Sequence, residues 1–176
     1  MRSFRSDPLL GIARGVLIFV MAVMIVAAAG LAIGLAAIVV MYPTVLAKLA
    51  EHGVAPVAGW WSAFGVILLG AAMVAIVFRF TQLLKHIVDT VGEGDPFIPD
   101  NAVRLNHMAW LTIAMQAVGL AIASLAYWLA QAFHEADADI DVNVDINALM
   151  LALVLFILAR VFRRGAEMRE ELEGTV

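Results

Sequence analysis

Long stretches without a charged residue constrain this chain more than any other feature. Residues 16–42 form 27 consecutive uncharged positions, residues 58–78 form 21 and residues 108–133 form 26. Crossing about 30 Å of hydrocarbon takes about 20 helical residues, so each stretch is long enough to span a bilayer. Backbone polar groups in lipid need partners within their own segment, so we expect these stretches to be helices.

A fourth apolar run, residues 146–159, has only 14 residues before Arg160. A run of that length is also compatible with a soluble core helix or an interfacial helix. We predict a fourth span because Val161 and Phe162 extend the run and because the long Arg160 side chain can reach the headgroups. The predicted spans cover residues 16–42, 58–80, 107–133 and 146–163.

The composition agrees with a lipid-facing surface. Of the 176 residues, 64% are hydrophobic and 15% are charged, and the mean hydropathy is +0.96. Soluble domains average about 45–50% apolar and about 25% charged residues. The length suits one domain, residues 1–176. The chain has no cysteine, which excludes disulfides, thiolate metal sites and iron–sulfur clusters.

The positive charges predict the orientation in the membrane. With four crossings, ten of the eleven Lys and Arg residues fall on one side, and only Lys48 falls on the other. Lys and Arg favour the cytoplasmic side, so both termini and a loop at residues 81–106 are expected there. The ten residues are Arg2, Arg5, Arg14, Arg79, Lys85, Arg104, Arg160, Arg163, Arg164 and Arg169.

The second and fourth helices are expected to continue beyond the membrane. After the second span, apolar residues recur at helical spacing, namely Phe80, Leu83, Leu84, Ile87 and Val88. Gly92 and Gly94 are expected to end this helix. Asp100 or Asn101 is expected to cap the third helix. A polar tail at residues 167–173 extends the fourth helix.

The two outer loops have different patterns. Residues 43–57 contain the helix breakers Pro43, Gly53 and Pro56. Residues 134–145 form an acidic loop in which polar and apolar residues alternate over most of its length, and this period predicts an extended segment. We expect its acidic side chains to be solvated, with an oxygen-ligated cation as the alternative.

Together these patterns predict an all-α membrane protein. Its fold is a bundle of four transmembrane helices with both termini in the cytoplasm, helices two and four extended into the cytoplasm, and a short extended acidic segment outside. A cleaved signal peptide is the alternative for the first span, because arginines precede it and alanines occupy residues 27–29. We expect a retained helix, since the apolar run outlasts the about 7–15 residues of a signal sequence.

Few polar residues lie within the predicted spans. Thr112 and Gln116 share one face of the third span, where interhelical hydrogen bonding is their ordinary role. A polar ligand site in the bundle is the alternative for this pair. An ion-coupled transporter is disfavoured, because such proteins place ionisable residues inside the membrane.

Arg79 and Arg160 each lie at the inner edge of an apolar run. Snorkelling of the side chain to the headgroups is the ordinary interpretation. The alternative is an ion pair with a loop acid, which would fasten the cytoplasmic loop to the bundle. The candidate acids are Asp89, Glu93 and Asp95.

The sequence contains no HExxH motif, no GxSxG motif and no phosphate-binding glycine loop. His86 and His107 come nearest to the histidine pair that a membrane haem needs, but two unpaired interfacial histidines are the simpler interpretation. We therefore expect no enzyme activity, no cofactor, no metal and no direct binding of nucleic acid.

Two cytoplasmic motifs carry a resemblance to a known family. The loop motif consists of Gly94, Asp95, Pro96 and Phe97, followed by Asn101, Arg104 and Leu105. The tail motif consists of Val161, Phe162, Arg163 and Gly165, and the chain ends in Thr175 and Val176. With these motifs the chain resembles the bacterial four-pass membrane proteins of domain-of-unknown-function family 2975. Members often end in Leu-Thr-Val, whereas this chain has Gly174 at the apolar position.

The resemblance implies a location in the bacterial inner membrane but no established activity. Family genes frequently lie beside small helix-turn-helix regulators, which implies a membrane partner or sensor for a cytoplasmic transcription factor. Our first hypothesis is a non-enzymatic protein that docks such a partner through its loop and tail, unless these residues merely plug the bundle. The second is a small permease or a lipid- or small-molecule-binding protein. Small residues in spans one and three fit packing within the chain or a homo-oligomer.

Overall fold

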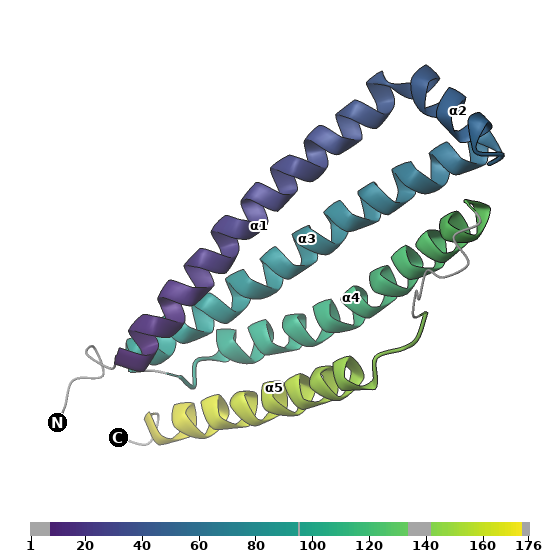
Figure 1. Cartoon of the computed structure of the whole chain (residues 1–176). Helices are drawn as coiled ribbons and strands as arrows, with labels where there is room; N and C mark the ends of the chain where they lie inside the picture. The colour runs from purple at the N-terminus through teal and green to yellow at the C-terminus, as the bar shows by residue number, and fades with distance from the viewer. Residues whose placement is uncertain (1–7, 95, 134–141, 174–176) are drawn as a thin grey trace. The chain divides into compact units, whose positions relative to one another are not determined.

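The regular secondary structure of the described residues consists of helices alone. A computed structural model describes residues 8–94, 96–133 and 142–173, with side chains up to residue 171 (Figure 1). Its five helices are α1 (Pro8–Val40), α2 (Tyr42–Glu51), α3 (Pro56–Gly92), α4 (Pro99–Ala132) and α5 (Ile146–Glu173). The prediction of an all-α fold is confirmed for these residues.

Four of the helices, α1, α3, α4 and α5, are long and apolar enough to cross a membrane. Helices α3 and α5 contain the predicted spans 58–80 and 146–163, including the short fourth run. Helix α1 ends at Val40 and α4 at Ala132, before the predicted span ends at residues 42 and 133. Helix α1 has no buried residue, and large apolar side chains such as Val26 and Val40 are 73% and 80% exposed. Apolar surface of this extent is unusual for a soluble monomer and is typical of a surface that faces lipid.

Helix α3 runs from Pro56 to Gly92 and α5 from Ile146 to Glu173, so both are longer than the predicted spans 58–80 and 146–163. Helix α3 ends at Gly92, and Gly94 follows with a φ of +91°, a conformation that glycine adopts without steric cost. The prediction that Gly92 and Gly94 terminate this helix is confirmed. Most of the predicted acidic outer loop, residues 134–141, lies outside the described residues, and residues 142–145 form neither helix nor strand.

Helix α2 was not expected from the sequence. Pro43 was interpreted as a helix breaker, but it occupies the first turn of α2. A proline is tolerated there because the amide hydrogens of a first helical turn have no partner within the helix. Gly53, with a φ of +73°, comes after α2, and Pro56 opens α3. The breakers therefore mark the boundaries of a short helix.

The start of α4 also differs from the prediction. The helix begins at Pro99, so Asp100 and Asn101 lie inside its first turn and neither precedes it as a cap. Proline suits this position for the same reason as in α2. The Asn101 amide nitrogen donates to the carbonyl of Ile98 over 3.0 Å, and its side chain is free for other contacts.

The chain divides into two compact units, which are described separately. Unit 1 comprises the described residues within 1–23, 76–114 and 145–176. Unit 2 comprises those within 24–75 and 115–144. Each unit has its own hydrophobic core.

The core of unit 2 forms around Trp60. This residue and two apolar residues of the α2 region, Leu49 and Val54, are less than 10% exposed. The Trp60 indole donates its Nε1–H to the carbonyl of Ile38 over 3.1 Å. Helix α1 ends at Val40, so this carbonyl lies in the last turn, where donors within the helix run out. Trp60 thus supplies a partner that the helix end lacks.

Small residues bring the long helices of unit 2 together. A Cβ atom at Gly34 would lie 3.9 Å from Ile67, one at Gly65 would lie 3.2 Å from Leu125, and one at Gly119 would lie 3.8 Å from Met73. These contacts join α1 to α3 and α3 to α4. Small residues at helix interfaces allow such close approach. Packing within the chain therefore accounts for Gly34 in the first span and Gly119 in the third, whereas a Cβ atom at Gly30 would meet nothing within 4 Å.

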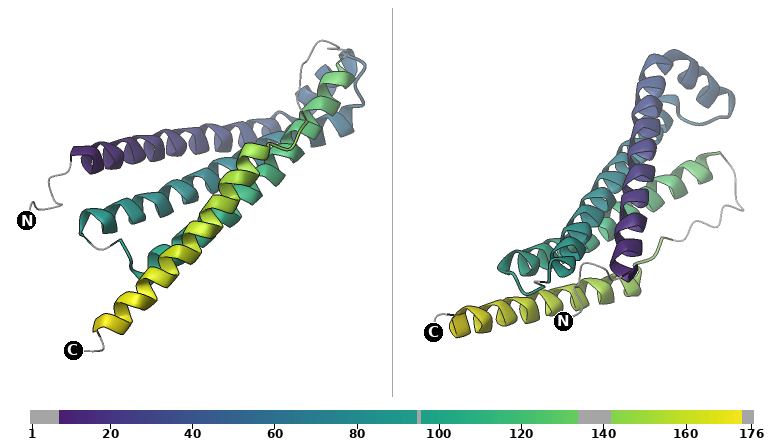
Figure 2. Two further views of the ribbon diagram at one scale, coloured as in Figure 1. Left: turned by 90° about the horizontal axis from the view of Figure 1, so that it is seen from below. Right: turned by 90° about the vertical axis from the view of Figure 1, so that its left-hand side faces the viewer.

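The core of unit 1 lies where α3, α4 and α5 meet. Figure 2 shows α5 running beside the first half of α4. Six buried residues form the core, namely Leu83, Leu105, Met108, Ala109, Leu155 and Ala159. The alanines let α4 and α5 approach closely, and the larger side chains fill the space around them. This core supports the α3–α4 turn, which carries the loop motif, and the part of α5 that carries the tail motif.

Replacing Trp60 with phenylalanine should lower the stability of the protein in detergent by about 1–2 kcal/mol, because the Ile38 carbonyl loses its donor and a smaller ring fills the core. Trp61 is the matched control. It is 61% exposed, so Trp61→Phe should change stability by about 0.5 kcal/mol or less. Thermal unfolding followed by far-UV circular dichroism measures both. Equal midpoints for the two variants would contradict the role given to Trp60.

Candidate functional site

The candidate site of unit 1 is the turn between α3 and α4, together with the part of α5 that packs against it. The amide of Glu93 donates to the Asp89 carbonyl and that of Gly94 to the Val91 carbonyl, both over 3.1 Å. These bonds satisfy carbonyls that the end of α3 would otherwise leave free. Asp95, which belongs to the predicted loop motif, lies outside the described residues.

The side-chain amide of Asn101 ties this turn to both helices. Its Nδ2 donates to the hydroxyl of Thr90 over 2.8 Å and to the carbonyl of Pro96 over 2.9 Å. Its Oδ1 accepts a hydrogen bond of 2.7 Å from Arg104. Asn101 is 0% exposed, and both of its donor hydrogens are used. One buried side chain therefore joins the last turn of α3, the loop and the first turns of α4.

Thr90 and Arg104 complete this network. The Thr90 hydroxyl donates to the Ile87 carbonyl over 2.8 Å, so its oxygen can accept from Asn101. Arg104 also lies 3.5 Å from a carboxylate oxygen of Asp100, but the Asp100 side chain is 75% exposed. An exposed ion pair of this kind contributes little to stability. The useful role of Arg104 is its hydrogen bond to Asn101.

Phe97 packs on the α5 segment that carries the tail motif. The ring centroids of Phe97 and Phe162 are 5.2 Å apart. A Cβ atom at Gly165 would lie 2.8 Å from the Phe97 ring, so only glycine admits the ring in this position. Phe97 nevertheless remains 44% exposed. The loop motif and the tail motif thus meet around one half-exposed aromatic side chain.

Several motif residues are therefore neighbours in unit 1. The structure brings together Pro96, Phe97, Asn101, Arg104, Phe162 and Gly165. Gly94 shapes the turn without a side chain. Thr175 and Val176 lie outside the described residues, so the predicted packing of the chain end beside the loop stays a prediction.

Asp89 has two basic partners near the end of α3. Its Oδ2 accepts a hydrogen bond of 2.8 Å from Lys85, four residues earlier in the same helix. Its Oδ1 lies 2.7 Å from an Arg14 guanidinium nitrogen, without the geometry of a hydrogen bond. Burial raises the pKa of the Asp89 carboxyl, but Lys85 and Arg14 outweigh burial and hold the pKa below its ordinary value. Asp89 therefore stays ionised at neutral pH.

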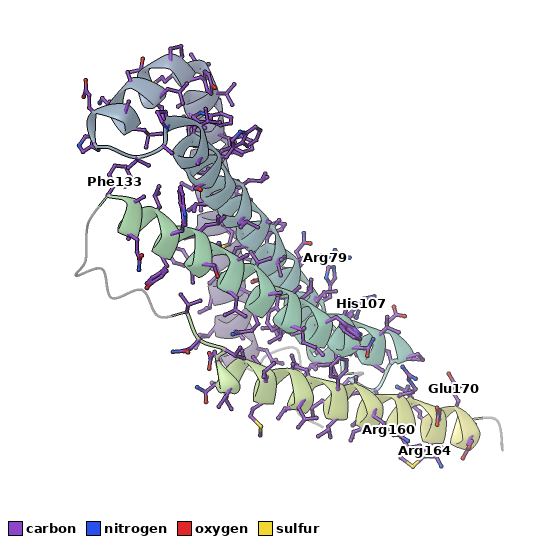
Figure 3. The ribbon with its side chains drawn as sticks, turned by 90° about the vertical axis from the view of Figure 1, so that its right-hand side faces the viewer. Arg79, His107, Phe133, Arg160, Arg164 and Glu170 are labelled. Atoms are coloured by element: carbon purple, nitrogen blue, oxygen red, sulfur yellow. The ribbon has the colours of Figure 1, made fainter. Side chains whose placement is uncertain are left out.

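The alternative interpretation of Arg79 and Arg160, an ion pair with Asp89 or Glu93, is not seen among the described residues, and the third candidate acid, Asp95, lies outside them. Figure 3 shows Arg79 on α3 and Arg160 on α5, and both are exposed. Arg79 donates to Gln82 over 3.2 Å. In the described part of the chain, no ion pair joins either arginine to Asp89 or Glu93. Asp89 pairs instead with Lys85 on its own helical face and with Arg14, because α1 passes beside the end of α3.

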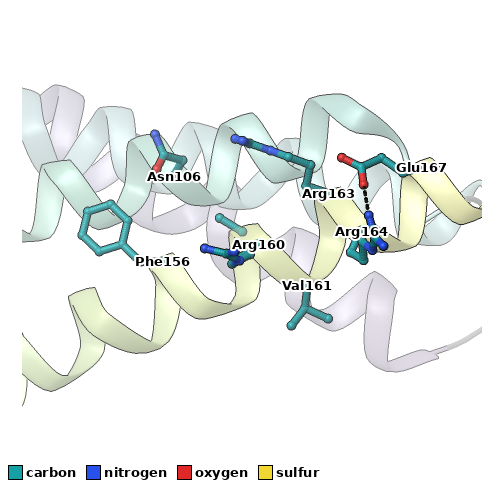
Figure 4. A pocket seen from close by; sticks show the side chains of 8 residues that line it. Asn106, Phe156, Arg160, Val161, Arg163, Arg164 and Glu167 are labelled. Atoms are coloured by element: carbon teal, nitrogen blue, oxygen red, sulfur yellow. Dashed lines mark hydrogen bonds and ion pairs between the residues drawn. The ribbon is translucent and has the colours of Figure 1, made fainter.

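A pocket of about 810 Å³ opens between α4 and α5 in the same unit (Figure 4). Phe156 and Ala159 contribute apolar surface, and Asn106 lines it from α4. Its remaining lining comes from Val161 and from four charged residues of α5, namely Arg160, Arg163, Arg164 and Glu167. Arg164 donates to Glu167 over 3.0 Å, the interaction drawn as a dashed line in Figure 4.

The proposed polar site in the bundle gains no support from Thr112. Its hydroxyl donates to the Met108 carbonyl over 3.0 Å, within α4, and the residue is 3% exposed. Gln116 is half-buried and belongs to unit 2. A hydroxyl that bonds to its own helix has no hydrogen left to donate to a ligand.

His86 and His107, the candidate haem pair, belong to no metal-binding group among the described residues, and His134 lies outside those residues. His86 is exposed, with its Nδ1 2.8 Å from the Gln82 carbonyl, and His107 is also exposed (Figure 3). Among the described residues, no group of three His, Asp or Glu side chains is placed to hold a metal ion.

Three residues of the candidate site, Thr90, Arg14 and Asn106, were not predicted from the sequence to belong to it. Thr90 gives no signal, because a threonine near a helix end is common. Arg14 was counted only as a positive charge, since a contact between distant segments leaves no local pattern. Asn106 is an isolated polar residue whose role depends on where α5 packs. Asn101 was detected through its place in the loop motif and as a candidate helix cap, but its burial was not predicted.

Comparison with known proteins gives one match. A family model described as "Protein of unknown function (DUF2975)" matches residues 42–176. Neither a search of curated proteins nor a search of solved structures found a match. The matched region includes the α3–α4 turn and all of α5.

The contact between Phe97 and Gly165 predicts strong coupling between two substitutions. Alanine is favoured over glycine within a helix by about 1 kcal/mol. Gly165→Ala alone should give none of this gain, because the new methyl group displaces the Phe97 ring. In a Phe97→Ala background the same substitution should stabilise the protein by about 0.5–1 kcal/mol.

Thermal unfolding of the four proteins in detergent measures this coupling. Gly15→Ala serves as the control, because nothing lies within 4 Å of a Cβ atom at Gly15 in α1. It should have the same effect in both backgrounds. If Gly165→Ala stabilised the protein equally with and without Phe97, the packing described here would be wrong.

Proposed function

This chain belongs to the DUF2975 family of proteins of unknown function, and on that premise we propose that it is a non-enzymatic membrane protein that docks a cytoplasmic partner. The partner is a small helix-turn-helix transcription regulator, and the docking surface consists of the α3–α4 turn and the adjoining face of α5. The protein spans the bacterial inner membrane four times, with both termini in the cytoplasm.

Four crossings place ten of the eleven Lys and Arg residues on one side of the membrane. In this arrangement the α3–α4 turn and the far end of α5 lie in the cytoplasm, where such a regulator would be found. The reverse orientation would put this basic side outside, against the positive-inside rule.

The single observation that carries the docking proposal is the half-exposed Phe97 in a fixed turn. Its loop is held by the Asn101 amide, and one side of its ring rests on Phe162 and Gly165. Aromatic side chains that are fixed before binding lose little conformational entropy when a partner covers them. Phe97 therefore suits an anchor for a protein partner.

The alternative function, a small permease, has less support. Permeases need a polar path through the bundle, and the hydroxyl of Thr112 is already bonded within α4. Catalysis is also disfavoured, because no nucleophile is paired with a base among the described residues of the turn. A homo-oligomer remains compatible with docking, since lipid-facing surface is available on α1 and α5.

Cysteine labelling tests the orientation directly, because the chain has no cysteine of its own. Single substitutions Glu51→Cys and Asp100→Cys place a thiol at exposed positions after the first span and before the third. In intact spheroplasts, a maleimide that cannot cross the membrane should label residue 51 and leave residue 100 unlabelled until the cells are opened. Labelling of residue 100 in intact cells would refute the proposed orientation.

If a helix-turn-helix regulator is the partner, its gene is expected beside the gene for this chain, and the absence of such a neighbour would count against this partner. Docking is then tested by mixing the purified regulator with the detergent-solubilised full chain. Phe97→Asp should weaken the complex by at least about tenfold, since a central aromatic anchor typically contributes about 2 kcal/mol or more. Phe97→Tyr keeps the ring and is the control, with little change expected. A neighbouring regulator that does not bind, or that binds Phe97→Asp unchanged, would contradict the proposal.

A further inference from the structure

The pocket between α4 and α5 lies where the uncharged run of α5 ends. Two of its apolar lining residues, Phe156 and Ala159, belong to that run, and the third, Val161, follows Arg160. Its charged lining begins with Arg160, the first charged residue after the run. In a membrane protein, this transition from apolar to basic residues places the pocket at the level of the lipid headgroups.

The charges of the pocket are not balanced. Three arginines and one glutamate line it, and Arg164 is paired with that glutamate, Glu167. Within the described residues, neither Arg160 nor Arg163 has a hydrogen-bond or ion-pair partner. Figure 4 shows Arg163 extending toward the side of the pocket on which Asn106 lies, while Arg164 turns to Glu167. Two guanidinium groups therefore remain available in one pocket.

Two arginines beside an amide fit the chemistry of a phosphate. The guanidinium group presents planar pairs of N–H donors that match two phosphate oxygens, and such charge-assisted bonds are stronger than neutral ones. The amide of Asn106 can add a neutral donor. The Phe156 ring offers apolar surface for the part of a lipid next to its phosphate. Basic pockets between membrane helices commonly hold anionic headgroups.

We propose that Arg160 and Arg163, together with Asn106, bind a phosphate oxyanion, supplied by the headgroup of an anionic phospholipid. A free phosphate ion offers the same oxygens, but the depth of the pocket and its apolar lining favour the lipid. Arg164 and Glu167 form a wall of the site and neutralise each other. This proposal needs neither the regulator nor Phe97, so it can fail or succeed independently of the docking function.

The test measures binding of phosphatidylglycerol with a short acyl chain to the full chain in detergent. Arg160→Gln and Arg163→Gln should each raise the dissociation constant by about tenfold or more, because each removes charged hydrogen bonds to phosphate. Arg79→Gln is the matched control. It removes the same charge from another exposed arginine next to an apolar run, outside the pocket, and should change the constant by less than about twofold.

Further ligands distinguish the sources of phosphate. If inorganic phosphate at millimolar concentration displaces the lipid, the site binds phosphate oxygens, and a free phosphate ion is sufficient to occupy it. Phosphatidylglycerol that binds while inorganic phosphate and phosphatidylcholine do not supports the lipid headgroup. Equal losses for Arg79→Gln and the pocket variants would show general charge attraction and overturn the proposal, as would unchanged binding in the pocket variants. Circular dichroism on the same samples verifies that each variant is folded.

Discussion

The buried amide of Asn101 is the interaction on which the organised part of unit 1 depends. Apolar contacts between long helices hold them together but do not favour one axial position strongly over another. Asn101 does so, because its three hydrogen bonds reach Thr90 in α3, Pro96 in the loop and Arg104 in α4. A buried amide with unsatisfied groups would cost several times what a satisfied one contributes, so these partners fix the geometry of the turn.

In unit 2, a backbone carbonyl at a helix end obtains its hydrogen-bond donor from a different kind of side chain. There the carbonyl of Ile38 near the end of α1 receives its hydrogen bond from the Trp60 indole. In both units, one large or polar side chain satisfies backbone groups that a helix end or a turn leaves without partners. The apolar spans then need only small residues and volume to pack. Because the specific polar contacts are made at helix ends and turns, the residues of the loop motif lie there and not within the apolar spans.

The helices could be predicted well from the sequence, because uncharged runs, apolar periodicity and Gly92 each act locally. Helix α2 was missed because proline disrupts the interior of a helix but is tolerated in the first turn, where Pro43 lies. Asp89 was considered as a partner of Arg79 or Arg160, but it pairs with Arg14. This pair could not be predicted, because Arg14 reaches Asp89 only through tertiary packing. Asn101 was interpreted as a cap, since its position in the turn was visible but its burial was not. The pocket around Arg160 depends entirely on how α4 and α5 pack.

The two proposals about function rest on the same arrangement. A turn that is fixed before any partner arrives can present Phe97 as an anchor, and a pocket that forms beside it can present two arginines to a phosphate. Both features lie in unit 1, whereas unit 2 holds the aromatic cluster around Trp60. The docking proposal and the phosphate proposal share the packing of α4 against α5 as their structural basis.

Hydrogen exchange followed by mass spectrometry tests most directly whether Asn101 fixes the turn. With Asn101→Ala, amides of residues 93–104 should exchange at least about tenfold faster, because the loss of its hydrogen bonds removes more than about 1.4 kcal/mol of local stability. Amides of α2 in unit 2 should be unchanged. Asn106→Ala is the matched control. The Asn106 side chain makes no hydrogen bond among the described residues, so this variant should leave the exchange of residues 93–104 unchanged. Equal protection of these residues in wild type and Asn101→Ala would contradict the account.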